Sequence, residues 1–185
     1  MSSRTSRQRA VEVAQKPVVI AHYLRDDGVI PNNQKLPLLI YKGSLRLPEE
    51  EPAEAIEQLL QKNRWGASWR NGIYTYHHYH STAHEVLLVL AGTAKVQLGG
   101  EQGITEVLRA GDVVVIPAGV GHKNLGASQD FAILGAYPEG QKWDMCYGKP
   151  GERPEADRNI ARVPLPKKDP VYGTEGPLMG RWQVP

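Results

Sequence analysis

The chain has 185 residues, of which 22 are Lys or Arg and 20 are Asp or Glu, so its formal net charge is only +2. This near balance excludes charge steering as the basis for a nucleic-acid or acidic-membrane partner. No apolar run approaches the roughly 18 residues that span a bilayer, and the single cysteine, Cys146, excludes an intrachain disulfide. We therefore expect a cytoplasmic protein with one domain, no nucleic-acid partner and no membrane partner.

The two ends of the chain differ in composition from its middle. Residues 1–16, which begin MSSRTSRQRA, are basic and polar and lack the apolar centre of a secretory signal, so we expect a disordered basic tail. Residues 148–185 are rich in proline and poor in apolar side chains, which favours an extended segment packed on the domain or on a partner subunit. A single domain is then expected over residues 17–147.

The first half of the domain alternates short apolar runs with turn clusters. Between Pro17 and Leu47, runs such as LPLLIYKGSL are separated by clusters such as RDDG, which indicates flanking strands. Residues 51–63, EPAEAIEQLLQKN, place apolar side chains at helical spacing, with Pro52 near the start and acids in the first turn. We expect one short helix there, followed by a loop that carries Trp69 and Arg70.

A series of short apolar runs follows the expected helix, and each run ends at Gly or Pro. These runs are EVLLVLAG, TAKVQLGG, ITEVLRAGD, VVVIPAGVG and FAILGAYPEG. Many short strands with regular turn signals are typical of an all-β sandwich or barrel. The run at residues 85–92 is apolar at alternate positions of both parities, so both of its faces should be buried, and one face needs a cover beyond the barrel interior.

Histidine is concentrated in the stretch from Tyr76 to Glu85, YHHYHSTAHE, which holds four of the chain's six histidines. On a strand, side chains two positions apart share a face, so His78 and His80 should point the same way. Glu85 starts the next strand and could return to the same pocket, and His122, after a Pro-Gly turn, could add a third imidazole. Three imidazoles and one carboxylate suit a first-row divalent ion and leave one or two positions for another ligand.

The neighbours of these residues divide by the same parity. His77 should face away from the pocket, and His84 should point away from the carboxylate that follows it, so surface or supporting hydrogen bonds are expected for both. Tyr74 and Tyr76 share the parity of His78, which places them either on the pocket wall or in core packing.

Two further residues could serve chemistry and also have simpler explanations. Arg70 could receive a substrate carboxylate, although a surface ion pair is the favoured reading. Cys146, in WDMCYG, has no activating base near it in the sequence and is expected to be an inert packed thiol.

Residues 72–92 and 111–122 resemble the two motifs of the cupin superfamily. The first motif is matched at Gly72, His78, His80, Glu85 and Gly92, and the second is matched at Gly111, Pro117, Gly119 and His122. The asparagine that cupins often carry four places after the last histidine is Gly126 here, and Asn124 stands nearby as a candidate pocket residue. Longer stretches, including NNQKLPLLIYKG, WRNGIY, HHYHSTAHEVL, PAGVGHK and GAYPEGQKWD, resemble the bacterial cupins of the YjlB type.

The resemblance implies a double-stranded β-helix, which is the jelly-roll barrel of cupins. It also implies one divalent first-row transition metal (Fe, Mn, Ni or Zn), and the residues at the ligand positions are His78, His80, Glu85 and His122. Cupins commonly dimerise, and the run at residues 85–92 needs a cover that a second subunit or the N-terminal segments could supply. A homodimer is therefore expected.

The resemblance also bears on function. Acireductone dioxygenase is similar to this chain in size, in the spacing from His78 to Glu85, and in the turn of the second motif. We therefore expect a metal-dependent enzyme for a small molecule, such as a dioxygenase acting on an oxygen-rich substrate. A metal-dependent decarboxylase or sugar isomerase stays open because similar ligand sets serve those reactions. The alternative from another class is a non-catalytic cupin whose metal helps to hold a small acid or sugar.

Overall fold

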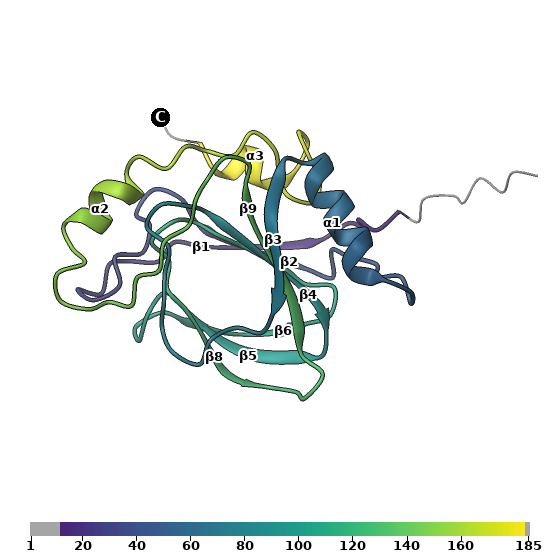
Figure 1. The fold of residues 1–185 in the computed structure, drawn as a ribbon, viewed down its shortest axis with the longest axis horizontal. Coiled ribbons are helices and arrows are strands. Elements are labelled where there is room, and N and C mark those ends of the chain that lie inside the picture. The colour runs from purple at the N-terminus through teal and green to yellow at the C-terminus, as the bar shows by residue number, and fades with distance from the viewer. Residues whose placement is uncertain (1–11, 184–185) are drawn as a thin grey trace, which may run out of the picture.

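The computed structural model of the chain describes residues 12–183, and its strands form two antiparallel sheets that face each other (Figure 1). The strands are β1 (Val18–His22), β2 (Leu38–Lys42), β3 (Trp65–Asn71), β4 (Glu85–Ala91), β5 (Thr93–Leu98), β6 (Ile104–Arg109), β7 (Val113–Ile116), β8 (His122–Ala127) and β9 (Ala132–Pro138). The larger sheet has the order β1-β2-β7-β4-β9-β3, and the smaller sheet has the order β6-β5-β8. This arrangement confirms the predicted all-β jelly-roll barrel.

Three helices accompany the sheets in the described part of the chain. They are α1 (Pro52–Lys62), α2 (Glu155–Ile160) and α3 (Pro177–Arg181). The helix expected at residues 51–63 is confirmed as α1, with Pro52 in its first turn. Within residues 12–183, no helix has the length and the apolar character needed to cross a membrane.

The core between the two sheets is built from side chains that alternate along each strand. On β5, Ala94, Val96 and Leu98 are buried, whereas Thr93 and Lys95 are exposed. Side chains from β2, β4, β6, β7 and β9 complete this inner cluster, which includes Leu38, Ile40, Leu87, Val89, Leu108, Val114, Ile116 and Ile133. One face of the smaller sheet therefore lines the barrel, and the other faces solvent.

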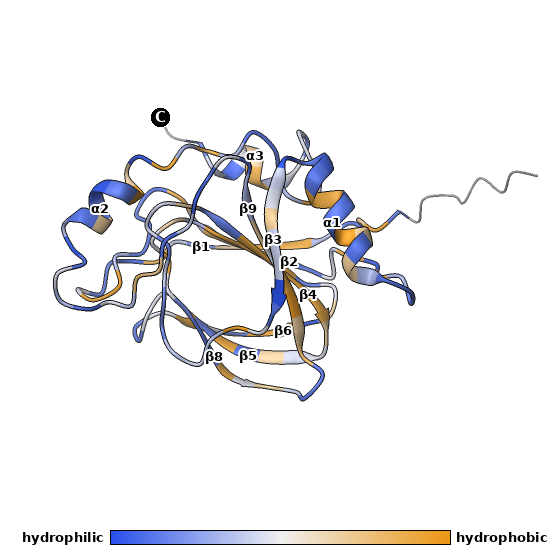
Figure 2. Ribbon diagram, in the orientation of Figure 1, coloured by the Kyte–Doolittle hydropathy of each residue, from blue (hydrophilic) through white to orange (hydrophobic). Residues whose placement is uncertain are grey.

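The outer face of the larger sheet is also buried. Val86 and Leu88 of β4 pack in one cluster with Ile56 of α1 and with Leu178 and Trp182 near the C-terminus. Figure 1 shows α1 and α3 on the side of the larger sheet opposite to β5 and β8, and Figure 2 shows the hydrophobic middle of that sheet. The chain itself supplies this cover. The face therefore gives no support to the expected homodimer, which stays a prediction.

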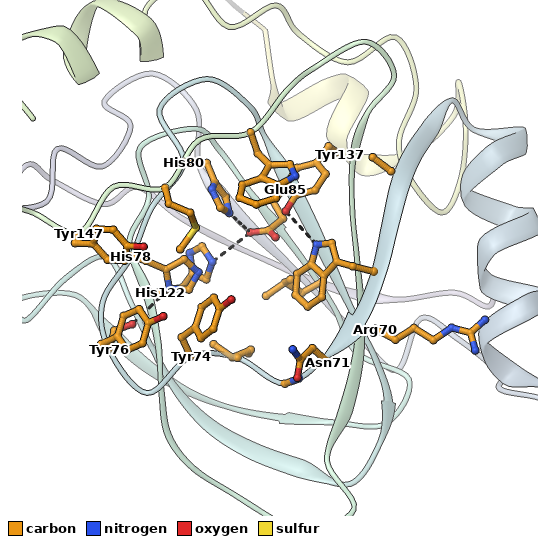
Figure 3. Close-up of a pocket in the computed structure, with 17 residues that line it drawn as sticks. Arg70, Asn71, Tyr74, Tyr76, His78, His80, Glu85, His122, Tyr137 and Tyr147 are labelled. Atoms are coloured by element: carbon orange, nitrogen blue, oxygen red, sulfur yellow. Dashed lines mark hydrogen bonds and ion pairs between the residues drawn. The ribbon is translucent and has the colours of Figure 1, made fainter.

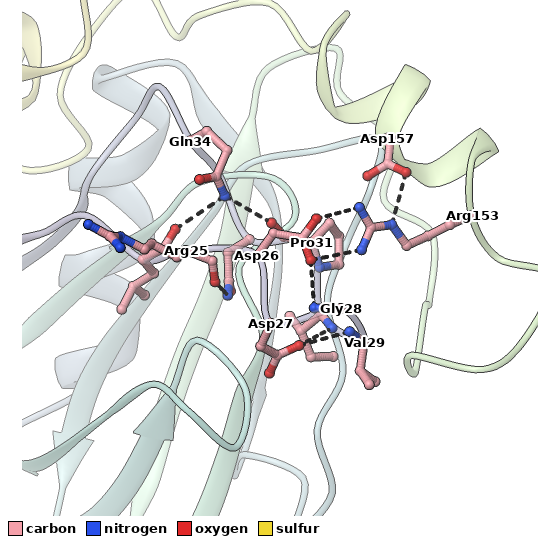
Figure 4. Close-up of polar contacts among 12 residues, drawn as sticks. Arg25, Asp26, Asp27, Gly28, Val29, Pro31, Gln34, Arg153 and Asp157 are labelled. Atoms are coloured by element: carbon pink, nitrogen blue, oxygen red, sulfur yellow. Dashed lines mark hydrogen bonds and ion pairs between the residues drawn. The ribbon is translucent and has the colours of Figure 1, made fainter.

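Several contacts hold the C-terminal segment on the domain, including an ion pair and a buried carboxylate. Arg153 forms a two-pronged ion pair with Asp26, with Nη1 to Oδ1 at 2.9 Å, and its Nε donates to Asp157 at 2.9 Å (Figure 4). The buried carboxylate of Asp169 accepts hydrogen bonds from the Tyr41 hydroxyl at 2.6 Å and from the Leu178 N–H at 3.1 Å. These contacts join the segment to its own chain.

Two local features differ from the sequence expectations. Residues 148–185 are not extended throughout, because α2 and α3 lie within them, and helices this short leave little periodic signal. Trp69 and Arg70 lie in β3, which pairs with β9, rather than in a loop. The composition of β3, WGASWRN, has few β-branched residues, and its register shifts between Gly66 and Trp69, so it does not read as a strand.

The expected N-terminal tail is only partly covered by the structure. Residues 1–11 lie outside the described residues. The Gln15 N–H donates to the Ser44 carbonyl at 2.9 Å, and the Arg46 N–H donates to the Val13 carbonyl at 2.7 Å. Residues 13–15 therefore pair with residues 44–46 and belong to the ordered domain, so the boundary predicted at residue 16 lies too far along the chain.

Candidate metal centre and pocket

The second motif holds the first through the backbone. The His122 N–H donates to the His78 carbonyl at 3.0 Å, the His78 N–H donates back at 3.3 Å, and the Gly119 N–H donates to the His80 carbonyl at 2.8 Å. His78 and Tyr79 make only isolated bridges, so the strand expected around them is not regular. Because these bridges preserve the extended backbone locally, alternate side chains still share a face.

Three imidazoles meet at the base of a pocket. His78, His80 and His122 each offer a ligand atom within 4.8 Å of the other two, and all three residues are buried. The Oε2 atom of Glu85, at the start of β4, lies 3.3 Å from Nε2 of His80 and 3.2 Å from Nε2 of His122 (Figure 3). The structure thus groups His78, His80 and His122, with the Glu85 carboxylate next to two of them, and ligation by these four residues stays a prediction.

The three imidazoles share one orientation. In each, Nδ1 faces a backbone carbonyl oxygen, which can only accept a hydrogen bond. A proton on Nδ1 satisfies this carbonyl and leaves the Nε2 lone pair for a metal ion, as in histidines that bind metals. The contacts are His78 with the Tyr76 carbonyl at 3.4 Å, His122 with the Val120 carbonyl at 3.2 Å, and His80 with the Asp144 carbonyl.

The Glu85 carboxylate gives a second way to test whether these residues suit a metal ion. Oε2 of Glu85 is buried and has no hydrogen-bond partner, although two imidazole nitrogens lie close to it. Burying an unpaired carboxylate oxygen is costly, whereas a cation between the carboxylate and the imidazoles would satisfy it. Neutral imidazoles together with one carboxylate form a donor set that suits a first-row divalent ion. The residues present therefore fit such an ion.

Electrostatics inside the cluster favour a neutral His78 ring and an ionised Glu85 carboxylate that interacts with His80. Burial, and next the neighbouring His122, lower the pKa of His78 to about 3. Burial acts to raise the pKa of Glu85, but the adjacent His80 and His122 outweigh it and hold that pKa below its usual range. Burial also opposes a charge on His80, yet the Glu85 carboxylate outweighs it and raises the pKa of His80. The carboxylate is therefore negative at neutral pH.

The cavity above the imidazoles has a volume of about 400 Å³. Its wall includes Tyr137 of β9, whose hydroxyl oxygen accepts a hydrogen bond from Nε1 of Trp69 at 3.0 Å. The Trp69 ring lies against Gly135, where an added Cβ would come within 2.3 Å of the indole, so glycine is required there for close approach. Burial, and next the Glu85 carboxylate, raise the pKa of Tyr137 above its usual range.

Sequence reasoning assigned no pocket role to Tyr137 or to the loop at residues 139–147. Trp143, Met145 and Tyr147 of this loop also line the pocket. Tyr137 lies at the end of the apolar run FAILGAYPEG, and the stretch GAYPEGQKWD was used only as a family resemblance. A tyrosine at the end of a buried strand is the signal that could have indicated a polar group on the pocket wall.

The four candidate substrate residues differ in position. Tyr74 and Tyr76 line the pocket. This is the first of their two expected placements, the pocket wall, and not packing in the core. Arg70 lies at the rim but points away from the imidazoles in Figure 3, and its Nη2 lies 3.3 Å from Oε1 of Glu57 in a surface ion pair. Asn124, on β8, is not among the residues that line the pocket, and its Oδ1 accepts a hydrogen bond from the Gly126 N–H at 2.8 Å.

The remaining histidines of the stretch lie outside the cluster. Nε2 of His77 lies 3.2 Å from Oε1 of Gln97 and 3.1 Å from Oε1 of Glu101. His84 is buried, its Nδ1 accepts a hydrogen bond from the Ala118 N–H at 2.9 Å, and its ring packs on Trp182. Neither side chain faces the pocket, as parity predicts.

Asp144 ties the loop at residues 139–147 to the first motif. Its carboxylate accepts hydrogen bonds from the Ser81 N–H at 2.6 Å and from the Ser81 hydroxyl, while its carbonyl faces His80. Cys146 next to it is buried, and burial, followed by the Asp144 carboxylate, raises the pKa of its thiol to about 11. A thiol with this pKa is protonated at neutral pH, as expected for a packed cysteine.

Comparisons with known proteins agree with the motifs. The family model for the cupin domain matches residues 70–133. The uncharacterized protein YjlB of Bacillus subtilis is 44% identical over 161 residues, which are 87% of this chain and 94% of that protein. This chain therefore has a relative that matches it over nearly the full length of both proteins.

Solved structures with this fold are more distant. Acireductone dioxygenase from Bacillus anthracis, with a cadmium ion in its active centre, is 16% identical, and the match covers 51% of this chain and 64% of that enzyme at a TM-score of 0.39. The epimerase RmlC from Legionella pneumophila is also 16% identical, with 66% of this chain and 72% of that enzyme covered at a TM-score of 0.36. These similarities do not discriminate between reactions.

Proposed function

Because the chain belongs to the cupin superfamily, and within it to the YjlB-type proteins, we propose that it is a metal-dependent enzyme for a small molecule, with dioxygenation as the leading reaction. The observation that supports this most is the common orientation of His78, His80 and His122, whose Nδ1 atoms all face backbone carbonyls at the base of a cavity of about 400 Å³. A purely structural ion would need no cavity of this size beside it.

The side chains divide the work of such a reaction. Bound by the three imidazoles and Glu85, a first-row divalent ion supplies Lewis-acid or redox chemistry. The Tyr137 hydroxyl accepts a hydrogen bond from Trp69 and lies beside Glu85, so its proton would orient either that carboxylate or a substrate oxygen above the imidazoles. Ile73 and Leu87 line the same cavity and exclude water from its inner part.

Metal content and oxygen consumption test the proposal together. We expect protein purified without an affinity tag to carry close to one equivalent of a first-row metal by mass spectrometry. Loaded with ferrous iron or manganese, it should consume oxygen with at least one substrate in a panel of enediols, dicarboxylates and flavonoids. Full metal occupancy without turnover of any kind would favour the non-catalytic alternative, and absence of metal binding would contradict both.

We also propose the homodimer, on different grounds from those of the sequence. Among the described strands, β1 pairs only with β2, and its Val18 side chain is 67% exposed. Such an edge can pair with another strand. Light scattering after gel filtration should then give a mass near twice the 20.5 kDa of one chain. A stable species of 20.5 kDa on dilution would contradict the dimer.

A further inference from the structure

Exposed aromatic side chains are concentrated at the mouth of the pocket. Among the described residues, the large aromatic side chains that are exposed are Tyr23, Tyr74, Tyr76, Trp143 and Tyr147. All of these except Tyr23 line the pocket. Rings left in water at one place cost free energy that a ligand can recover, so such a concentration marks a binding surface.

The rings form stacked pairs on two sides of the imidazole cluster. Tyr74 and Tyr76 stack with centroids 5.0 Å apart and an interplanar angle of 16°. Tyr137 and Trp143 stack with centroids 6.0 Å apart and an angle of 20°. Figure 3 shows Tyr74 and Tyr76 on one side of His122, and Tyr137 on the side beyond Glu85. Both pairs and the three imidazoles line the same pocket.

The lining offers no cation for an acidic ligand. Arg70 is the only Lys or Arg among the described residues that line the pocket, and its guanidinium is engaged by Glu57 on the outside. Lys149 is not a lining residue, and its Nζ lies 4.9 Å from the centre of the Tyr147 ring. Glu85 adds a buried negative charge at the base. A carboxylate or phosphate placed away from the ion site would therefore lose its hydration with no basic side chain to replace it.

We infer that the pocket takes a flat aromatic molecule that carries hydroxyl or carbonyl oxygens at one end and no carboxylate or phosphate. Its ring lies between the Tyr74–Tyr76 pair and the Tyr137–Trp143 pair, and its oxygens point to the imidazoles. This inference rests on the proposed function, which places a metal at the oxygen-binding end. It narrows the oxygen-rich substrates considered above to phenolic ones, and it disfavours dicarboxylates and nucleotide sugars.

Three matched probes distinguish the effect of an aromatic ring on binding affinity from the effect of a negative charge. Methylcatechol, cyclohexanediol and dihydroxybenzoate present the same pair of oxygens on a neutral aromatic ring, on a saturated ring and on a carboxylated aromatic ring. Their binding is measured by calorimetry on the zinc-loaded chain, because zinc is redox-inert and prevents turnover. We expect methylcatechol to bind at least about tenfold more tightly than cyclohexanediol, since two stacking surfaces and the more acidic phenolic hydroxyls both favour it. The substitutions that remove a stacking surface separate these two causes. Dihydroxybenzoate should bind more weakly than methylcatechol.

Single substitutions test where the aromatic ring of the ligand binds. Tyr76→Leu and Trp143→Leu should each weaken methylcatechol binding by roughly 2- to 10-fold, because each removes one stacking surface. Both variants should keep the zinc content of the wild type. Tyr23→Leu is the matched control, since Tyr23 is equally an exposed tyrosine but does not line the pocket, and methylcatechol affinity should be unchanged.

Several results would overturn the inference. Equal affinities for methylcatechol and cyclohexanediol would do so, as would wild-type affinity in both leucine variants. Tighter binding of dihydroxybenzoate that is lost in Arg70→Gln would show that Arg70 turns inward to meet an acid. If the chain binds no zinc, the proposed function fails. The aromatic binding site can still be tested, because the effect of Tyr76→Leu and Trp143→Leu on methylcatechol affinity does not require the ion. The same measurements are then made on metal-free protein.

Discussion

Two buried histidines from one short stretch lie in different regions of the molecule and hold their protons on opposite nitrogens. In the pocket, Nδ1 of His80 faces the carbonyl of Asp144 and must donate. Behind β4, Nδ1 of His84 accepts from the Ala118 N–H at 2.9 Å, and the ring packs on Trp182 with centroids 4.7 Å apart. The backbone group opposite Nδ1, rather than burial or the density of imidazoles, thus separates a candidate ligand from a structural histidine.

The strongest way to break this comparison is to remove the pocket histidine. His80→Ala should lower the affinity for Zn²⁺ by more than about 100-fold, because even residues that only orient ligands contribute 10- to 100-fold. Competition with a chromophoric chelator measures the affinity. His77→Ala is the matched control, and it should bind zinc like the wild type, because His77 contacts Gln97 and Glu101 outside the pocket. Unchanged Zn²⁺ affinity in His80→Ala would contradict the distinction between His80 as a candidate ligand and His84 as a structural histidine.

The opposite result is expected behind β4. His84→Ala should lower the free energy of unfolding by about 2–3 kcal/mol, because it leaves the buried Ala118 N–H unpaired and a void against Trp182. Urea denaturation of the metal-free chain measures this loss. His84→Gln keeps an acceptor for that N–H and should recover part of the stability. Zinc affinity should stay at the wild-type value in both variants, and a loss as large as that of His80→Ala would contradict the comparison.

The pH dependence of stability sharpens the same point. Burial lowers the pKa of His84 to about 3, whereas the unfolded chain takes up this proton near pH 6.5. Acid therefore stabilises the unfolded state, so stability is fully present above pH 6.5 and falls as the pH drops toward 3. From pH 6.5 to pH 5 the wild type should lose about 1.5 kcal/mol more than His84→Gln, as measured by denaturation at each pH. Parallel curves for the two proteins would show that His84 titrates normally.

The smallest expected effect concerns the support of His80. Asp144→Ala should weaken Zn²⁺ binding roughly tenfold, because the loop that presents the Asp144 carbonyl loses its hydrogen bonds to Ser81. Asp130→Ala provides the control, since the Asp130 carboxylate contacts only the exposed Ser128 hydroxyl near β9. Equal affinities in the two variants would mean that the carbonyl is held without the carboxylate.

The sequence was sufficient for the barrel and for the grouping of the cluster, for physical reasons that can be named. Alternation along β5 and the continuous apolar run of β4 predict strands with one and with two buried faces, and the structure has both. Alternation also places His78 and His80 on one face, even though their segment makes only isolated bridges. Local periodicity is therefore informative wherever the backbone is extended.

Other features depend on contacts between distant parts of the chain, and spacing does not reveal these. The partner of His80 is Asp144, 64 positions away, and the partner of the His84 ring is Trp182. The strand β3 is stabilised by pairing with β9 rather than by its own composition. The outer face of β4 was correctly read as needing a cover, but only the folded chain shows that the C-terminal segment and α1 supply it.

The contact between His80 and the Asp144 carbonyl also sets an order of events during protein synthesis. The ribosome completes both histidine motifs before it adds residues 139–147, which supply this contact and the Trp143 side of the pocket. A nascent chain that ends before this loop has the candidate metal-binding nitrogens but lacks one of the groups that orient them. Chains truncated before Asp144 should therefore compete poorly for zinc with the longer chain.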